Sequence, residues 1–123
     1  MYSLTDGVSN IIVGKVAEEY ATRYLEEKGY QIIERNYRCR LGELDIVART
    51  GYLWAFVEVK GRRSDRYGTP AEAITTGKQK RFINAVNHYV MTKDIDDEDM
   101  RIDVVEVFID GDRMRINHIL NAF

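Results

Sequence analysis

The hydrophobic positions recur at two different spacings along the chain. From residue 11 to residue 28 they return every three or four residues, which predicts an amphipathic helix. Its apolar side chains form two neighbouring rows, one of Ile12, Val16, Tyr20 and Tyr24 and one of Val13, Ala17, Ala21 and Leu25. Gly29 follows and is a typical helix stop. A second helix is predicted over residues 77–91, with Thr75 or Thr76 as its cap.

Apolar and β-branched residues in shorter runs predict five strands. The strands cover residues 30–38, 42–49, 53–60, 101–110 and 113–120. Residues 61–75 read as a loop and residues 94–100 as an acidic linker. A helix between strands allows a crossover connection, so the order predicts an α/β fold in which one mixed five-stranded sheet carries flanking helices. We expect a single domain over residues 1–123, which is long enough for one core.

Composition narrows the class of protein. No run of about 18 apolar residues is present and the N-terminus lacks a secretory pattern, so we expect a cytoplasmic protein with no membrane segment. The single cysteine, Cys39, excludes an internal disulfide.

Charge is unevenly spread. The net charge of −2 argues against a protein that coats nucleic acid by charge alone. The segment from Lys60 to Arg81 nevertheless holds seven basic residues against two acids, Asp65 and Glu72. That segment suits a local phosphate-binding face, and an ordinary solvated surface explains it equally well.

Three charged residues interrupt the apolar strands at residues 42–60. Asp45, Glu58 and Lys60 occupy positions where charged residues are normally depleted. Because side chains alternate across a strand, Glu58 and Lys60 share a face with Trp54 and Phe56.

The face taken by Asp45 depends on the turn near Thr50 and Gly51. A two-residue turn pairs Arg49 with Tyr52 and places Asp45 diagonal to Glu58 on the same face. A loop of odd length would turn Asp45 to the opposite face.

Two neighbouring carboxylates repel each other unless a cation lies between them. Oxygen ligands with open positions suit Mg²⁺ or Mn²⁺, and Lys60 would orient or activate water there or offset charge in the transition state. A cross-strand salt bridge at a wet sheet edge is the alternative that spacing leaves open.

These residues resemble a known pattern. Asp45 followed by Glu58-Val59-Lys60 is similar to the PD-(D/E)xK nuclease signature, with Leu44 where the parent signature has proline. The whole chain resembles the YraN-like family of uncharacterised bacterial proteins, which is related in fold to archaeal Holliday junction resolvases. The matching segments lie in the family's order from residue 14 to residue 105: "GKVAEEYATRYLEEKGY", "NYRCRLGELDIVA", "FVEVKGRRS", "YGTPAEAIT", "GKQKR" and "RIDVV".

The resemblance implies a restriction-endonuclease-like fold and a set of site residues. It implies that Asp45, Glu58 and Glu18 bind the metal and that Lys60 acts with them in catalysis. Helical periodicity leaves Glu18 and Glu19 undistinguished, and the family match selects Glu18. Glu43 would be an outer ligand or a surface residue.

Basic and aromatic residues and one amide, that of Gln79, are candidates for contact with nucleic acid around this site. They are Arg62, Arg63, Arg66, Tyr67, Lys78, Gln79 and Lys80. The implied activity is metal-dependent hydrolysis of phosphodiester bonds in branched or structured DNA, and the likeness to resolvases allows a homodimer. A nucleic-acid-binding module without catalysis and a protein-interaction adaptor are the alternatives.

Overall fold

The structure is a computed structural model that describes residues 7–63, 74–95 and 99–123, with the backbone alone for residues 7–11 and 63. The elements in chain order are α1 (Gly7–Glu27), β1 (Gln31–Cys39), β2 (Gly42–Thr50), β3 (Leu53–Arg63), α2 (Thr76–Thr92), β4 (Asp99–Asp110) and β5 (Arg113–Ile119). This order is the predicted one, and the α/β class is confirmed. Three boundaries were wrong by two residues or more. Helix α1 begins at Gly7 rather than at residue 11, residues 61–63 belong to β3 rather than to a loop, and Asp99 and Met100 belong to β4 rather than to the acidic linker.

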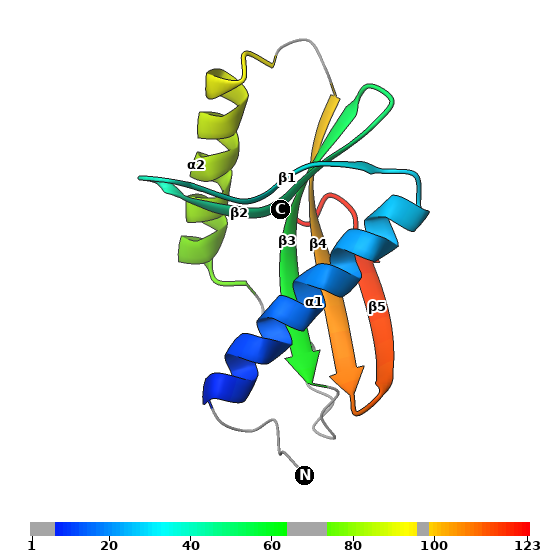
Figure 1. Cartoon of the computed structure of the whole chain (residues 1–123). Helices are drawn as coiled ribbons and strands as arrows, with labels where there is room; N and C mark the ends of the chain where they lie inside the picture. Colours follow the sequence, from blue (N-terminus) through cyan, green and yellow to red (C-terminus); the bar gives the residue numbers. More distant parts are fainter. Residues whose placement is uncertain (1–6, 64–73, 96–98) are drawn as a thin grey trace.

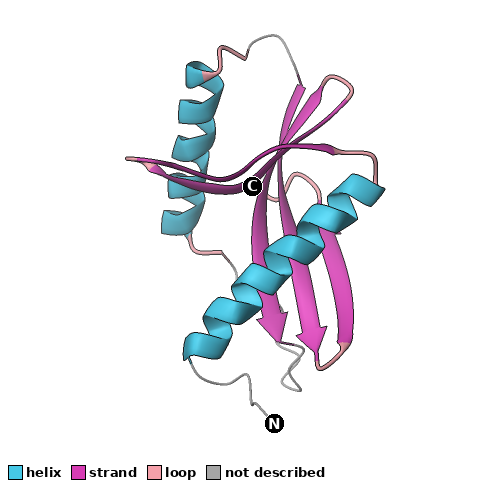
Figure 2. Cartoon of the chain, in the orientation of Figure 1, coloured by secondary structure: helices cyan, strands magenta, loops and turns pink. Residues whose placement is uncertain are grey.

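The five strands form one mixed sheet in the order β1-β2-β3-β4-β5. The β3–β4 pair is parallel and the other pairs are antiparallel. A parallel pair needs a crossover connection, and α2 lies in that connection. Helix α1 runs diagonally across one face of the sheet, whereas α2 packs on the opposite side (Figures 1 and 2). Within the described ranges, no helix is long and apolar enough to cross a membrane.

Helix α1 packs on the sheet through the row of small side chains. Ala17, Ala21 and Leu25 are fully buried, whereas Ile12 of the other row is 48% exposed. Gly61 of β3 lies beneath this row, and a Cβ on Gly61 would stand only 2.8 Å from the Cβ of Ala17. The absence of a side chain at Gly61 therefore lets the helix approach β3 directly.

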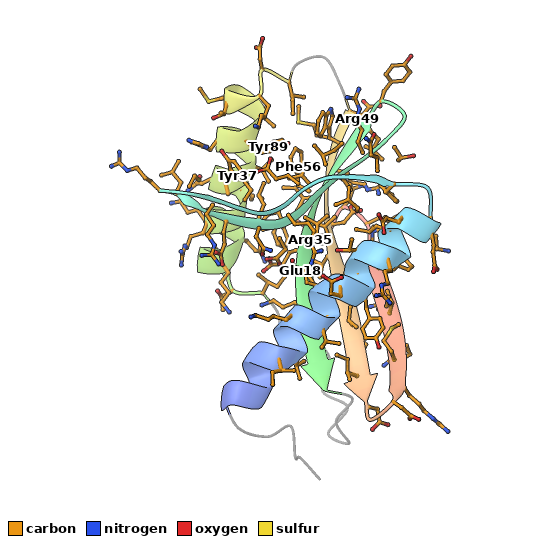
Figure 3. All side chains as sticks on the ribbon, in the orientation of Figure 1. Glu18, Arg35, Tyr37, Arg49, Phe56 and Tyr89 are labelled. Atoms are coloured by element: carbon orange, nitrogen blue, oxygen red, sulfur yellow. The ribbon has the colours of Figure 1, made fainter. Side chains whose placement is uncertain are left out.

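Helix α2 covers the opposite face through Phe82, Ala85, Val86 and Tyr89, which are buried. The side chain of Thr75 accepts the N–H of Lys78 at 3.2 Å, so Thr75 is the cap. The core on this face includes Phe56, whose ring centroid lies 5.9 Å from that of Tyr89 (Figure 3).

The β2–β3 hairpin has a two-residue turn, but its register differs from the expected one. Thr50 pairs with Leu53 and Arg49 with Trp54, rather than Arg49 with Tyr52. The ladder ends at Ile46–Val57, after which β2 stays paired with β1 and β3 stays paired with β4. We call the point of divergence the strand fork.

The β1–β2 ribbon changes face at the strand fork. Leu44 packs in the cluster beneath α2, whereas Ile46 packs in the cluster beneath α1. Regular alternation would put both side chains on one face, so the strand is twisted at Asp45. Asn36 on β1 has a φ of 55°, a left-handed conformation that an unstrained strand does not contain.

A buried polar cluster ties β4 to β5. Asp103 is fully buried and accepts hydrogen bonds from Arg101 at 2.8 Å, His118 at 2.8 Å and the backbone N–H of Asn121 at 3.1 Å. Burial alone would raise the pKa of Asp103, but the hydrogen bonds from His118 and Arg101 outweigh it and hold that pKa below 3.8.

Candidate active site

The strand fork brings two carboxylates together. A ladder extended by one pair would set Asp45 directly opposite Glu58, and the two carboxyl groups lie close enough to shift each other's pKa. Asp45 Oδ2 also accepts the backbone N–H of Val59 at 2.8 Å. Asp45 thus satisfies a β3 backbone donor beyond the point where the β2–β3 ladder has ended.

Burial perturbs both carboxylates. It is the main cause that raises the pKa of Asp45, and it raises the pKa of Glu58 to about 8, with the neighbouring Asp45 adding to the effect. Without a cation, the pair therefore holds a proton at neutral pH. The Nζ atom of Lys60 lies 3.9 Å from Oε2 of Glu58, and these two side chains are 24% and 18% exposed.

The fork is bordered by a hollow on each face of β3. The first measures about 210 Å³ and lies on the α2 side, lined by Glu43, Glu58, Lys60, Lys78, Arg81 and Phe82. The second measures about 250 Å³ and lies on the α1 side, lined by Gly14, Lys15, Glu18, Asp45 and Val59. Because Asp45 lines one hollow and its neighbour Glu58 lines the other, the carboxylate pair spans the two faces.

Glu18 lines the same hollow as Asp45, but its carboxylate has protein partners. Its Oε1 accepts from Arg35 Nη2 at 2.8 Å, from Arg35 Nε at 3.2 Å and from Asn36 Nδ2 at 2.8 Å. Glu18 and Arg35 lie side by side between α1 and β1 (Figure 3). Over the described ranges, no group of three or more His, Cys, Asp or Glu side chains stands close enough to hold a metal ion. A direct role of Glu18 as a ligand stays a prediction.

Glu43 and Asp45 line different hollows, although residues two apart in a regular strand share a face. The twist at the fork directs Glu43 to the hollow of Glu58, while Asp45 lines the hollow of Glu18. Glu43 is exposed and pairs with Arg38 at 3.4 Å, which places it at the rim.

The candidates for contact with nucleic acid lie in different surroundings. Lys78 is exposed at the first hollow, whereas Lys80 is exposed and does not line it. Gln79 donates its side-chain N–H to the carbonyl of Ile74 at 2.9 Å, so its amide supports the start of α2. Arg62 pairs with the buried Glu106 at 3.2 Å. Arg66, Tyr67 and the side chain of Arg63 lie outside what the structure describes.

Two further residues line the hollows without having been singled out from the sequence. Arg81 lies three positions after Lys78, and Lys15 lies three positions before Glu18. Residues three apart share a helix face, so the spacing carried this signal.

The comparison with known proteins places these residues in a family. The model of the uncharacterised protein family UPF0102 matches residues 17–107, a range that includes Glu18, Asp45, Glu58 and Lys60. The chain belongs to the UPF0102 family. The predicted YraN-like resemblance is thereby confirmed.

UPF0102 relatives match along most of this chain. A UPF0102 protein from Syntrophus aciditrophicus (strain SB) is 48% identical over 114 residues, which cover 93% of this chain and 90% of the relative. A UPF0102 protein from Alkaliphilus metalliredigens (strain QYMF) is also 48% identical, over 90% of this chain and 96% of its own length. A UPF0102 protein from Geobacter sulfurreducens is 46% identical over 93% of this chain and 90% of its own length.

Proposed function

We propose that this protein is a nuclease that hydrolyses phosphodiester bonds with a divalent cation, Mg²⁺ or Mn²⁺. The observation that carries the proposal is the half-buried pair of Asp45 and Glu58 with Lys60 beside it. Two carboxylates that share a proton in a partly dry site destabilise the folded chain, so their presence calls for a reason other than stability. Strongly perturbed groups in a hollow are typical of functional sites.

The chemistry of the donors fits a hard cation. The pair offers carboxylate oxygens, and Mg²⁺ is usually held by one or two carboxylates while waters and a substrate phosphate complete its shell. A cation bound between Asp45 and Glu58 would take the place of the proton that the pair shares. When bound, such an ion polarises a phosphate and lowers the pKa of water.

The chain's own residues supply the remaining functions. Lys60 is held beside Glu58, where its ammonium group can orient water and offset the charge that develops on the phosphate. Lys78 and Arg81 line the same hollow and would bind the phosphates on either side of the bond that is cut. The substrate class of branched or structured DNA rests on the resemblance to resolvases, as does a homodimer.

Cleavage assays test the proposal. Purified protein is incubated with labelled four-way junctions, flaps, single strands and duplexes in Mg²⁺, Mn²⁺ or EDTA. We expect metal-dependent cleavage, with losses on the order of a hundredfold or more in Glu58→Gln and Lys60→Met because each removes a group near the reacting phosphate. Lys80→Ala is the matched control, since Lys80 does not line the hollow.

Two outcomes would reject the nuclease. Cleavage that survives in both site variants would come from a contaminant. Salt-dependent DNA binding without cleavage, and without Mn²⁺ binding in calorimetry, would instead indicate a binding module, because the basic lining alone is sufficient for phosphate contact.

A further inference from the structure

Glu18 binds two consecutive residues of β1 through a single oxygen. Arg35 donates Nε and Nη2 to Oε1, and Asn36 donates Nδ2 to the same atom at 2.8 Å. The side chain of Glu18 is only 16% exposed, and Arg35 is 33% exposed. Charge-assisted hydrogen bonds of this kind are stronger and more directional than neutral ones. Glu18 on α1 therefore holds β1 in place at Arg35 and Asn36.

Glu18 holds β1 at the place where the β1–β2 ribbon is twisted. Arg35 pairs with Ile46 and Tyr37 pairs with Leu44, so Asn36 lies between these pairs and opposite Asp45. Asn36 holds its left-handed φ of 55° where the ribbon changes face. Asn tolerates this conformation better than most residues, but a strand residue without support prefers the extended region.

We infer that Glu18, Arg35 and Asn36 form a clamp that positions the carboxylate of Asp45 at the strand fork. The inference rests on the proposed function, in which Asp45 is a ligand of the cation. The clamp acts on the β1–β2 ribbon around Asn36. If Asn36 lost its hold on Glu18, the ribbon would relax at this residue and rotate Asp45 away from the N–H of Val59 and from Glu58. Glu18 is then a positioning residue, whether or not its second oxygen reaches the cation.

Titration calorimetry with Mn²⁺ on the full chain gives the first test. The informative variant is Asn36→Gly, because glycine adopts a positive φ without strain and the substitution removes the side-chain amide alone. We expect about tenfold weaker Mn²⁺ binding, the scale typical for loss of a residue that orients a metal ligand. Glu19→Gln is the control: it removes the second carboxylate partner of Arg35, 2.9 Å away, and leaves the contacts of Glu18 in place.

A double-mutant cycle separates the clamp from independent roles. Glu18→Ala alone should weaken Mn²⁺ binding, and Asn36→Gly added to it should weaken binding no further, because the amide has already lost its acceptor. If the two losses of Mn²⁺ affinity multiply in the double variant, Glu18 and Asn36 act separately, Glu18 as a metal ligand and Asn36 as a structural residue. That result would overturn the clamp.

The amide of Val59 provides a measurement that needs no metal. Asp45 Oδ2 accepts this N–H, so hydrogen exchange at Val59 reports where the carboxylate lies. In Asn36→Gly we expect exchange at Val59 to accelerate about tenfold, the effect of losing one hydrogen bond, while exchange at the buried Ala85 of α2 stays unchanged.

The two measurements distinguish failure of the proposed function from failure of the clamp. Wild-type protein that binds no Mn²⁺ would reject the proposed function, and exchange at Val59 would still decide whether the clamp exists. Unchanged protection of Val59 in Asn36→Gly would reject the clamp even in a protein that binds Mn²⁺ tightly. Acceleration at both Val59 and Ala85 would mean that the substitution loosens the whole fold, which also contradicts a local clamp.

Discussion

Replacement of Glu58 by glutamine should stabilise the metal-free protein at alkaline pH. The pKa of Glu58 is raised from 4.5 to about 8, so the folded chain keeps a proton that the unfolded chain releases. The raised pKa leaves stability intact below about pH 4.5 and lowers it progressively up to about pH 8. Glutamine mimics the protonated acid and is expected to avoid this loss.

The structure sets the magnitude of the effect. A difference of about 3.5 between the two pKa values corresponds to about 5 kcal/mol at most, at 1.36 kcal/mol for each pH unit. The side chain is 18% exposed and shares its proton with Asp45, so water and the partner lessen the effect. We expect the free energy of unfolding of Glu58→Gln to exceed that of the wild type by on the order of 2–4 kcal/mol at pH 9. Near pH 4.5 the two free energies should be equal.

Urea unfolding in EDTA measures this difference. Trp54 is the only tryptophan of the chain and is buried, so its fluorescence reports unfolding. Glu43→Gln is the matched control, because Glu43 lines the same hollow from an exposed position, and its effect should stay within about 0.5 kcal/mol at every pH. A Glu58→Gln protein that is no more stable than wild type at pH 9 would refute the reasoning.

Added Mn²⁺ connects this prediction to the proposed function. At pH 9 the cation should stabilise the wild type by mass action, whereas Glu58→Gln should gain little because it lacks one carboxylate of the pair. Equal gains in both proteins would show that the cation binds elsewhere.

Three further predictions follow from other parts of the fold. Asp103→Asn should lower the free energy of unfolding by about 3–5 kcal/mol at pH 7, because it leaves the buried guanidinium of Arg101 without its charge partner. The wild type should lose this advantage as the pH falls below 3.8, so the two stabilities measured by urea unfolding should converge. Gly42→Ala should lower stability by about 1–3 kcal/mol, since its Cβ would lie 2.2 Å from a backbone oxygen of α2, whereas Gly14→Ala, with nothing within 4 Å, should not. Lys78→Ala should reduce the salt dependence of DNA binding more than Lys80→Ala in fluorescence anisotropy, and equal effects would contradict a groove at the first hollow.

The elements could be predicted from periodicity, but the packing face of α1 could not. Both rows of the first helix are apolar. The row of Ala17 and Ala21 is the buried one because Gly61 on β3 faces it. That choice depends on a residue about 40 positions away, which no local pattern contains.

The even-numbered turn was predicted and the position of Asp45 was not. The turn is displaced by one residue, so Asp45 comes opposite Glu58 rather than diagonal to it. The face change at the strand fork also lies beyond regular alternation, although Asn36 gave a signal, since asparagine is uncommon inside strands and tolerates a left-handed backbone. The predicted roles of Arg66 and Tyr67 fall outside the described residues and stay predictions.

The contact between α1 and Gly61 limits how this protein can operate. Gly61 directly follows Lys60, and its backbone lies against Val13 and against Ala17, the residue immediately before Glu18. At Gly61 the helix and the strand therefore meet without an intervening β3 side chain. If the proposed function holds, a single methyl group added at Gly61 should lower activity by pushing α1 away from β3, without altering any charge.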